Sequence, residues 1–234
     1  MCKYAPGERL HTMRTLVILG AATLLACRAD TPPATDMTPI LRAARFTVPA
    51  GAGIPARPCG DSLAYFAGTA ITHCEAWYGK HLTALQEPVL CQSSLEEAKE
   101  IYRLTWLPSF HPSVVVRIDS DTAGLHLTAK VESGAGGYEP GHLARDTVFM
   151  LTETQAREFA DLLSAADFWR SPTVPPPDRA MGLDGAQWVL EGIANSRYHV
   201  VDRWSPEAGG PDARFRALCE WLLARSGFVT AAIY

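Results

Sequence analysis

Residues 125–132 read Leu-His-Leu-Thr-Ala-Lys-Val-Glu, and this stretch decides the class of fold. Apolar side chains occupy every second position from Leu125 to Val131, and more polar side chains occupy the positions between them. Because successive side chains of a β-strand point to opposite faces, this period of two predicts a strand with one apolar face. We therefore expect a sheet with one face in the core and the other in contact with water.

Further strands are expected on both sides of this segment. Residues 102–107, 113–119 and 147–151 are rich in the β-branched and aromatic side chains that strands favour. Residues 187–193 and 197–204 predict a hairpin that turns at Ala194-Asn195-Ser196. The second hairpin strand is expected to place its even-numbered side chains on one face and its odd-numbered side chains on the other.

Two amphipathic helices are expected to pack on this sheet. The first covers residues 153–167, begins with a capping box formed by Thr152 and Gln155, and ends at the aromatic pair Phe168-Trp169. The second runs from about residue 211 to residue 226 and stops at Gly227. This order of strands, helix, hairpin and helix predicts an α+β fold with a mostly antiparallel sheet.

Residues 59–100 carry a weaker pattern than residues 101–228, which we interpret as the α+β domain. Helical segments are expected in three pieces, which start at residue 61 or 62, near Trp77, and after Ser94 with Ile101 included. We therefore treat residues 59–100 as an irregular, partly helical lead-in. Residues 101–228 are similar in layout to small uncharacterised domains of exported bacterial proteins, a resemblance carried by the order of elements and the Phe168-Trp169 ending, and one that implies no activity.

An export signal is predicted near the beginning of the chain. Residues 13–27 read Met-Arg-Thr-Leu-Val-Ile-Leu-Gly-Ala-Ala-Thr-Leu-Leu-Ala-Cys, with a charged start, a short apolar core and small residues before the cysteine. The apolar core has about a dozen residues, whereas a helix that spans a bilayer needs ~20. We expect residues 1–26 to be a signal peptide, with Met13 as a more compact start than Met1.

The end of this segment, Leu24-Leu25-Ala26-Cys27, resembles the lipobox of bacterial lipoproteins. The resemblance implies a diacylglyceryl group on Cys27, cleavage after Ala26, and acylation, for example with palmitate, of the new amino terminus. It also implies a membrane-anchored protein of the cell envelope that faces the periplasm or the exterior. Residues 27–58, rich in proline, alanine and threonine, then form a flexible tether. An uncleaved signal anchor and a chance apolar run are the alternatives.

Composition bounds the partners of this chain. Its 234 residues are 47% hydrophobic, which is enough for an ordinary core. The net charge is -4, and removal of residues 1–26 takes away three positive side chains and one negative one, which leaves -6. An acidic chain without basic runs is poorly suited to phosphate backbones, so we expect no nucleic-acid partner.

Four cysteines remain besides Cys2 and Cys27, and an exported compartment permits them to form disulfides. Two disulfides are expected, with three pairings open. One of the four, Cys219, has an alternative interpretation as a small core side chain, because it lies in the apolar stripe of the last helix. No Cys-x-x-Cys pair occurs, so no structural zinc and no other cofactor is expected. The disulfide candidates are Cys59, Cys74, Cys91 and Cys219.

Two loops imitate ligand-binding motifs. The Gly-rich segment 134–141 lacks the lysine of a phosphate-binding loop, so we interpret it as a tight connection, with another small ligand left open. Asp119 and Asp121 resemble the start of a calcium loop, but Lys130 stands at the twelfth position, where a glutamate is needed. We interpret that segment as a turn, and we expect no metal site.

No complete catalytic constellation is recognisable, and we assign no catalytic residue. We expect a non-enzymatic, lipid-anchored envelope protein that binds an envelope component or acts as a scaffold. The alternative is an envelope hydrolase or small-ligand-binding protein that uses the Gly-rich loop and the late hairpin, with Glu139, His199 and Asp202 as ligand-binding residues. A purely structural role for Asp202 is the competing interpretation, since buried carboxylates need hydrogen-bond donors.

Overall fold

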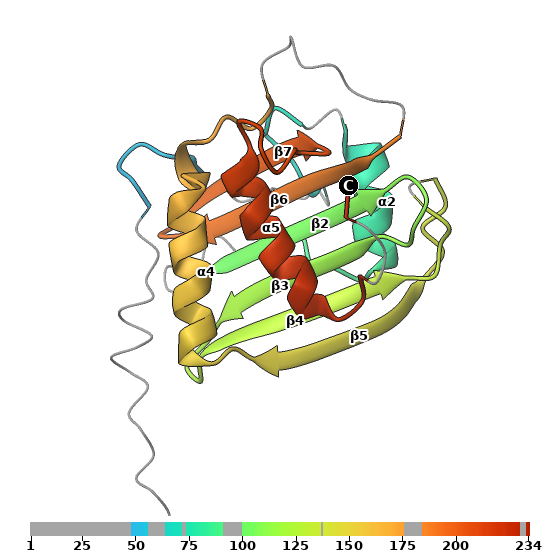
Figure 1. The fold of residues 1–234 in the computed structure, drawn as a ribbon, viewed down its shortest axis with the longest axis horizontal. Coiled ribbons are helices and arrows are strands. Elements are labelled where there is room, and N and C mark those ends of the chain that lie inside the picture. The colour runs from blue at the N-terminus through green and yellow to red at the C-terminus, as the bar shows by residue number, and fades with distance from the viewer. Residues whose placement is uncertain are drawn as a thin grey trace, which may run out of the picture. The chain divides into compact units, whose positions relative to one another are not determined.

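The computed structural model describes residues 48–55, 64–71, 74–90, 100–136, 138–175, 184–229 and 233–234. All of them belong to one compact unit, Asp36–Tyr234. Helices pack on an antiparallel sheet in this unit, which confirms the expected α+β class (Figure 1). Within the described ranges, none of the helices combines the length and the apolar character needed to cross a bilayer.

The sheet has seven strands in the order β1-β7-β6-β2-β3-β4-β5, and every neighbouring pair is antiparallel. Four consecutive strands form a meander, and the later hairpin adds to the free side of its first strand. The hairpin turns at Asn195 and Ser196, whose φ angles of 51° and 55° are those of a two-residue turn with both central residues left-handed. The strands are β1 Ile54–Pro55, β2 Ile101–Pro108, β3 Val114–Ser120, β4 Leu125–Glu132, β5 Leu143–Met150, β6 Ala186–Ala194 and β7 Arg197–Trp204.

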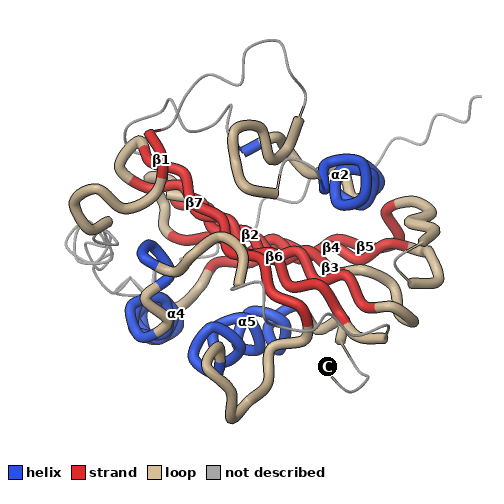
Figure 2. Tube along the Cα trace, turned by 90° about the horizontal axis from the view of Figure 1, so that it is seen from above, coloured by secondary structure: helices blue, strands red, loops and turns tan. Residues whose placement is uncertain are grey.

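The helices cover both faces of this sheet. Helices α4 (Glu153–Ala165) and α5 (Ala213–Ser226) lie on one face, and α2 (Glu75–Ala84) lies on the other (Figure 2). The predicted capping box is present at the start of α4, where the Thr152 N–H donates to Gln155 Oε1 at 2.8 Å. Helix α5 ends where predicted, at a left-handed Gly227 with φ 69°.

The face beneath α4 and α5 holds an apolar core. The large side chains of Trp106, Trp188 and Phe159 are at most 2% exposed there. The 3-10 turn η2 (Phe168–Arg170) follows α4 and presents the predicted aromatic pair, whose rings lie 6.0 and 6.3 Å from the ring of Tyr102. Edge-to-face packing of this kind stabilises an aromatic cluster beyond its buried area.

The opposite face of the sheet is covered over β2, β6 and most of β7, so the expectation of one wet face is wrong for these strands, whereas β5 is exposed. Residues 64–71 and 74–90 lie over this face, so that Arg103 and Glu191 are fully buried and Glu132 is 1% exposed. Polar side chains are buried there because the covering segment brings partners of opposite charge. Lys130 Nζ, for example, lies 2.9 Å from Glu87 Oε1.

Four segments differ from the sequence expectations. Residues 64–71 form turns instead of a helix, and Ile101 begins β2 instead of ending a helix. Strand β5 begins at Leu143, earlier than expected, because seven of its eight residues are exposed and an exposed strand has no apolar alternation to reveal it. Residues 48–55, expected within the tether, are docked, since Val48 packs against the core and β1 pairs with β7.

Two of the cysteines lie within the described ranges, and both are free thiols. Cys219 is fully buried in the core beneath α5, as the alternative interpretation expected. Cys74 packs on the opposite side of the sheet, at the start of α2, so these two cysteines do not pair with each other. Cys27, Cys59 and Cys91 lie outside the described residues, and a disulfide between Cys59 and Cys91 stays a prediction.

Candidate functional site

The three predicted ligand-binding residues are not brought together. Glu139 is exposed in the connection between β4 and β5, whereas His199 and Asp202 lie on β7. Strands β6, β2 and β3 stand between β7 and β4, so the two regions are four strand spacings apart, about 19 Å across the sheet. His199 and Asp202 themselves point to opposite faces, because an odd number of positions separates them on one strand.

Asp202 is a buried acceptor on the α2 face and is 6% exposed. Its carboxylate accepts hydrogen bonds from Tyr78 Oη at 2.9 Å and from Gln187 Nε2. Burial, followed by the charge of Asp202, raises the pKa of Tyr78 far above its usual range, so the phenol stays protonated and donates. Both oxygens of the carboxylate are engaged, which supports the structural interpretation of Asp202.

His199 lies on the other face, against the aromatic pair that ends α4. Its ring centroid is 5.1 Å from that of Phe168 and 6.0 Å from that of Trp169. The Nε2 atom lies 2.9 Å from the Ser171 carbonyl oxygen, which can only accept, so Nε2 carries the proton. Burial lowers the pKa of His199, and the imidazole is neutral at neutral pH.

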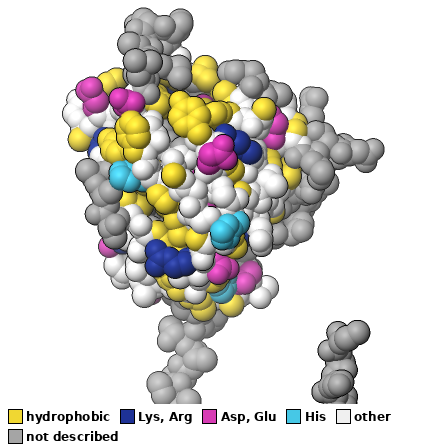
Figure 3. Space-filling view, turned by 90° about the vertical axis from the view of Figure 1, so that its right-hand side faces the viewer, with side chains coloured by type: hydrophobic (Ala, Val, Ile, Leu, Met, Phe, Trp, Pro, Cys, Tyr) yellow, Lys and Arg dark blue, Asp and Glu magenta, His cyan; other side chains and the backbone are white. Residues whose placement is uncertain are grey.

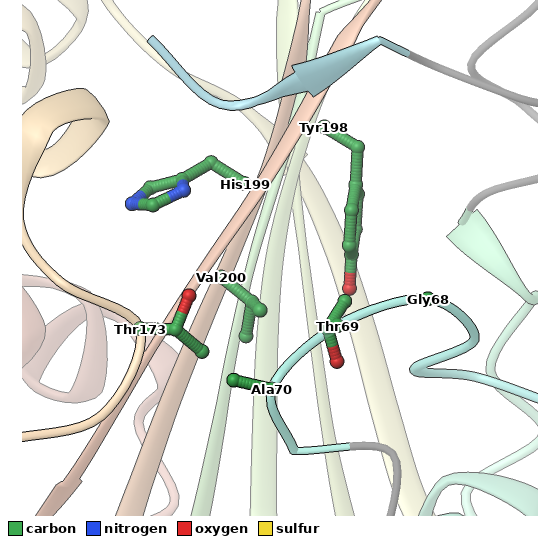
Figure 4. Close-up of a pocket in the computed structure, with 7 residues that line it drawn as sticks. All are labelled: Gly68, Thr69, Ala70, Thr173, Tyr198, His199 and Val200. Carbon is green, nitrogen blue, oxygen red and sulfur yellow. The ribbon is translucent and has the colours of Figure 1, made fainter.

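Two hollows border the outer edge of β7 beside His199. The smaller has a volume of about 100 Å³ and is enclosed by the 68–70 turn, Thr173 and β7. Figure 4 shows its lining, with Tyr198 and His199 projecting to opposite sides of the strand. The larger, about 530 Å³, lies between residues 50–53 and residues 169–173, and it shares His199 and Thr173 with the smaller.

The backbone edge of β7 is covered at both ends. Strand β1 pairs with Arg197 and Tyr198, and the Asp202 N–H donates to the Thr173 carbonyl at 2.8 Å. The Arg197 guanidinium donates to the carbonyls of Ala52 and Gly53, which holds this segment on the strand. We call this contact the Arg197 clasp.

Gly53 is required within the Arg197 clasp. Its φ is +64°, and a Cβ there would approach the Tyr198 carbonyl oxygen to 2.8 Å.

The groups that line the hollows are suited to binding a ligand. The smaller one offers the Thr173 hydroxyl, the backbone edge at Val200 and a neutral imidazole, whereas the Thr69 hydroxyl already donates to the Phe66 carbonyl at 2.8 Å. The Nε2–H of His199 is donated to the Ser171 carbonyl, so Nδ1 is the ring nitrogen that keeps a lone pair and can accept a hydrogen bond. These groups are suited to a small polar ligand or an extended backbone.

The Gly-rich loop is closed on itself, as expected for a tight connection. The Gly134 N–H donates to the Pro140 carbonyl at 3.1 Å, and Gly136 and Gly141 have φ angles of +89° and +68°. The calcium-like segment is a turn, in which Asp121 Oδ1 accepts from the Ala123 N–H at 2.7 Å. In the described part of the chain, His, Cys, Asp and Glu side chains form no group of three or more suited to a metal.

An exposed aromatic pair joins α2 to this loop. Trp77 and Tyr138, 40% and 73% exposed, meet edge to face at 5.3 Å, and Lys80 Nζ lies 4.0 Å above the Trp77 ring. Lys80 also donates to the Tyr138 carbonyl at 2.6 Å. Figure 3 looks onto this side of the molecule and shows hydrophobic side chains in separate groups with charged side chains between them. The pair therefore fixes the loop, and it is not part of one broad apolar surface.

A buried ionic network escaped the sequence analysis. Arg103 Nη2 lies 2.6 Å from Glu191 Oε2, and Tyr198 Oη donates to Glu191 Oε1 at 2.9 Å. Glu87 receives Arg117 at 3.0 Å and Lys130 at 2.9 Å. The sequence signal that reveals it is a charged side chain in the middle of an apolar strand, as at Arg103 and Glu191.

In this network, burial disfavours the charged form of each group, and the nearby opposite charges favour it. Burial opposes the charge of Arg103, but Glu191 and Glu87 outweigh it and raise the pKa of the guanidinium. Burial raises the pKa of Glu191, an effect that Arg103 and the Tyr198 hydroxyl oppose. Every charge therefore depends on its partners, which makes the network structural.

His81, Glu132 and Ser113 form a buried group that imitates a catalytic triad. His81 Nδ1 lies 2.9 Å from Glu132 Oε1, and the Ser113 hydroxyl lies 3.4 Å from the same nitrogen. In a serine hydrolase the hydroxyl and the acid contact different ring nitrogens, so that the ring can relay a proton. This group is instead a core hydrogen-bond cluster that joins α2 to β4.

No protein-family model matches this chain, and no curated protein matches it.

Proposed function

We propose that this chain is a lipid-anchored protein of the bacterial cell envelope, and that its α+β unit acts by binding, as a recognition or scaffold module. The observation that carries the proposal is the segment Leu24-Leu25-Ala26-Cys27 at the end of a short apolar core that begins after Arg14. Two or more acyl chains hold a protein firmly, because each buried methylene contributes about 0.8 kcal/mol.

The polar groups of the unit support binding over catalysis. Asp202, the pair of His81 and Glu132, and the pair of Arg103 and Glu191 are all engaged with internal partners. Groups committed in this way hold the fold together and are poorly placed to transfer protons to a substrate. The surfaces that offer free hydrogen-bonding capacity are edges and hollows, which suits recognition.

The distance between anchor and fold also suits a surface-displayed module. Cys27 and Val48, the first docked residue described, are 21 positions apart. A fully extended chain of that length spans at most about 70 Å. The unit would therefore work close to the membrane that holds its lipid.

Binding of a small ligand is a second candidate function. The two hollows beside His199 favour it, because they bring the Thr173 hydroxyl and a neutral imidazole together at one strand edge. A hydrolase that combines Glu139 with His199 and Asp202 receives no support from the geometry, since the three lie apart.

The anchor is tested by comparing the parent chain with Cys27→Ser in cells fed an alkyne-labelled palmitate. We expect label, signal cleavage and membrane association in the parent, and loss of all three in Cys27→Ser. Cys74→Ser is the matched control, because Cys74 is a free thiol inside the folded unit. A mass spectrum that shows an unlipidated parent with Met13 or Met1 still attached would contradict the anchor.

A further inference from the structure

Strand β5 forms an open edge of the sheet. It lies along the lower rim in Figure 1, and all its residues from 144 to 150 are exposed. Val148, Phe149 and Met150 are 62%, 36% and 49% exposed, and they alternate between the two faces. A strand with seven consecutive exposed residues, 144–150, offers a template for another strand.

The backbone groups of this edge can be placed from the ladder. The Leu151 N–H donates to the Leu125 carbonyl at 2.9 Å, which marks residues 151, 149, 147 and 145 as bonded toward β4. Because the pattern alternates in an antiparallel pair, the N–H and C=O groups of Asp146, Val148 and Met150 point outward.

The opposite edge of the sheet is protected. There β1, the Arg197 clasp and the bond from Asp202 to Thr173 cover β7. Proteins commonly cover, twist or charge their edge strands to prevent unwanted pairing. The β7 edge of this sheet is covered in this way. The β5 edge is not, because it exposes Val148, Phe149 and Met150 to solvent.

We propose that β5 pairs with β5 of a second copy of this chain, antiparallel, around a two-fold axis at Thr147. A two-fold axis perpendicular to a sheet pairs a strand with itself and closes both open edges at once. The pairing joins two sheets into one and does not depend on the lipid at Cys27.

The register follows from the side chains. An axis at Asp146 or at Arg145 would set two like charges directly opposite each other. An axis at Val148 would pair only residues 146–150, because β5 ends at Met150. An axis at Thr147 pairs residues 144–150, sets Arg145 opposite Phe149 of the second copy, and sets Asp146 opposite Val148 of the second copy.

The second copy fits this edge better than the chain's own leading segment. Pro32, Pro33 and Pro39 in residues 28–47 lack the N–H that a ladder requires, whereas β5 contains no proline. The strand is already extended, so little further ordering is needed. Its charges, Arg145 and Asp146, cancel, so two copies do not repel. The pairs of Asp146 with Val148 around the axis would form roughly four hydrogen bonds.

Cysteine cross-linking tests the pairing in membranes that contain the full chain. Thr147→Cys should give a reducible dimer several-fold above the parent, because the two Cα atoms would lie ~4.5 Å apart, within the reach of a disulfide. Arg145→Cys lies on the same strand and the same face, but its own copy would lie four positions away, so it should stay at the parent level. Equal cross-linking of both, cross-linking of neither, or a link only to a different protein overturns the proposal.

A charge test does not rely on cysteines. Val148 would lie opposite Asp146, so Val148→Lys should retain the dimer and Val148→Asp should weaken it, with about a tenfold difference in dissociation constant. Native mass spectrometry of the full chain released from detergent, at a series of dilutions, measures this difference. Both variants should fold, since Val148 is 62% exposed, and circular dichroism checks it. Equal effects of Lys and Asp, or a parent chain that is monomeric throughout, overturn the proposal.

Discussion

The same strands form both faces of the sheet, but one face is stabilised by apolar packing and the other by buried charged and polar side chains. On β2, Tyr102, Leu104 and Trp106 enter an apolar core beneath α4 and α5. Between them, Arg103 and Thr105 are equally buried, but they face residues 64–90. Apolar contacts are non-directional, so they stabilise many arrangements of the helices. Buried charges need particular partners, so the second face fixes where the covering segment lies.

The largest expected effect is on the charged face. Arg103→Met would leave Glu191 and Glu87 short of a buried partner, and the free energy of unfolding should fall by about 3 to 5 kcal/mol. Urea unfolding measures this change. The double variant Arg103→Met/Glu191→Leu removes both charges and should recover much of the loss. A double variant as unstable as the single one would show that packing, not charge pairing, governs this face.

On the apolar face, Leu222→Ala should lower the free energy of unfolding by about 3 kcal/mol, because it leaves a cavity among side chains that are fully buried. The conservative Leu222→Met should lower it by less than about 1.5 kcal/mol. If Leu222→Met lowered the free energy of unfolding as much as Leu222→Ala, the contrast between the two faces would be wrong. The apolar face would then depend on particular side chains as strictly as the charged face does.

The smallest effect concerns His199, at the edge of the apolar face. Burial lowers its pKa in the folded state, so below about pH 6.5 the unfolded chain takes up a proton that the folded chain refuses. Its contribution to stability is present above that pH and is lost as the pH falls. His199→Gln should therefore lose less unfolding free energy than the parent between pH 7.5 and 5.5. Parallel losses in the two proteins would show that other titrating groups govern the response.

Local signals predicted much of the fold. The alternation over residues 125–132 coincides with β4, and Thr152 with Gln155 marks the start of α4, because period and capping depend only on neighbours in sequence. The covered second face was missed because Arg103 and Glu191 are 88 positions apart and meet only in the tertiary structure. Each looks, in the sequence, like a side chain that needs water.

The candidate site was predicted less well. The acceptor role of Asp202 fits its place between Val200 and Trp204 on one strand face, but its donor Tyr78 comes from α2, 124 positions away. The neutral state of His199 depends on the Ser171 carbonyl and on burial beside Phe168, which belong to another segment. Glu139 is remote from both because three strands intervene, and strand order is not encoded in any single stretch.

The Arg197 clasp affects how the unit responds when the chain is pulled from its N-terminal side. Among the described residues, tension applied from the N-terminal side meets the packing of Val48 on the core and then the bonds of Ala52 and Gly53 to Arg197, just before β1. This contact therefore carries load before the hairpin of β6 and β7 is strained. Each residue of β1 released from β7 lengthens the free chain by about 3.3 Å, so a pull from the N-terminal side would extend this segment before it strains the hairpin.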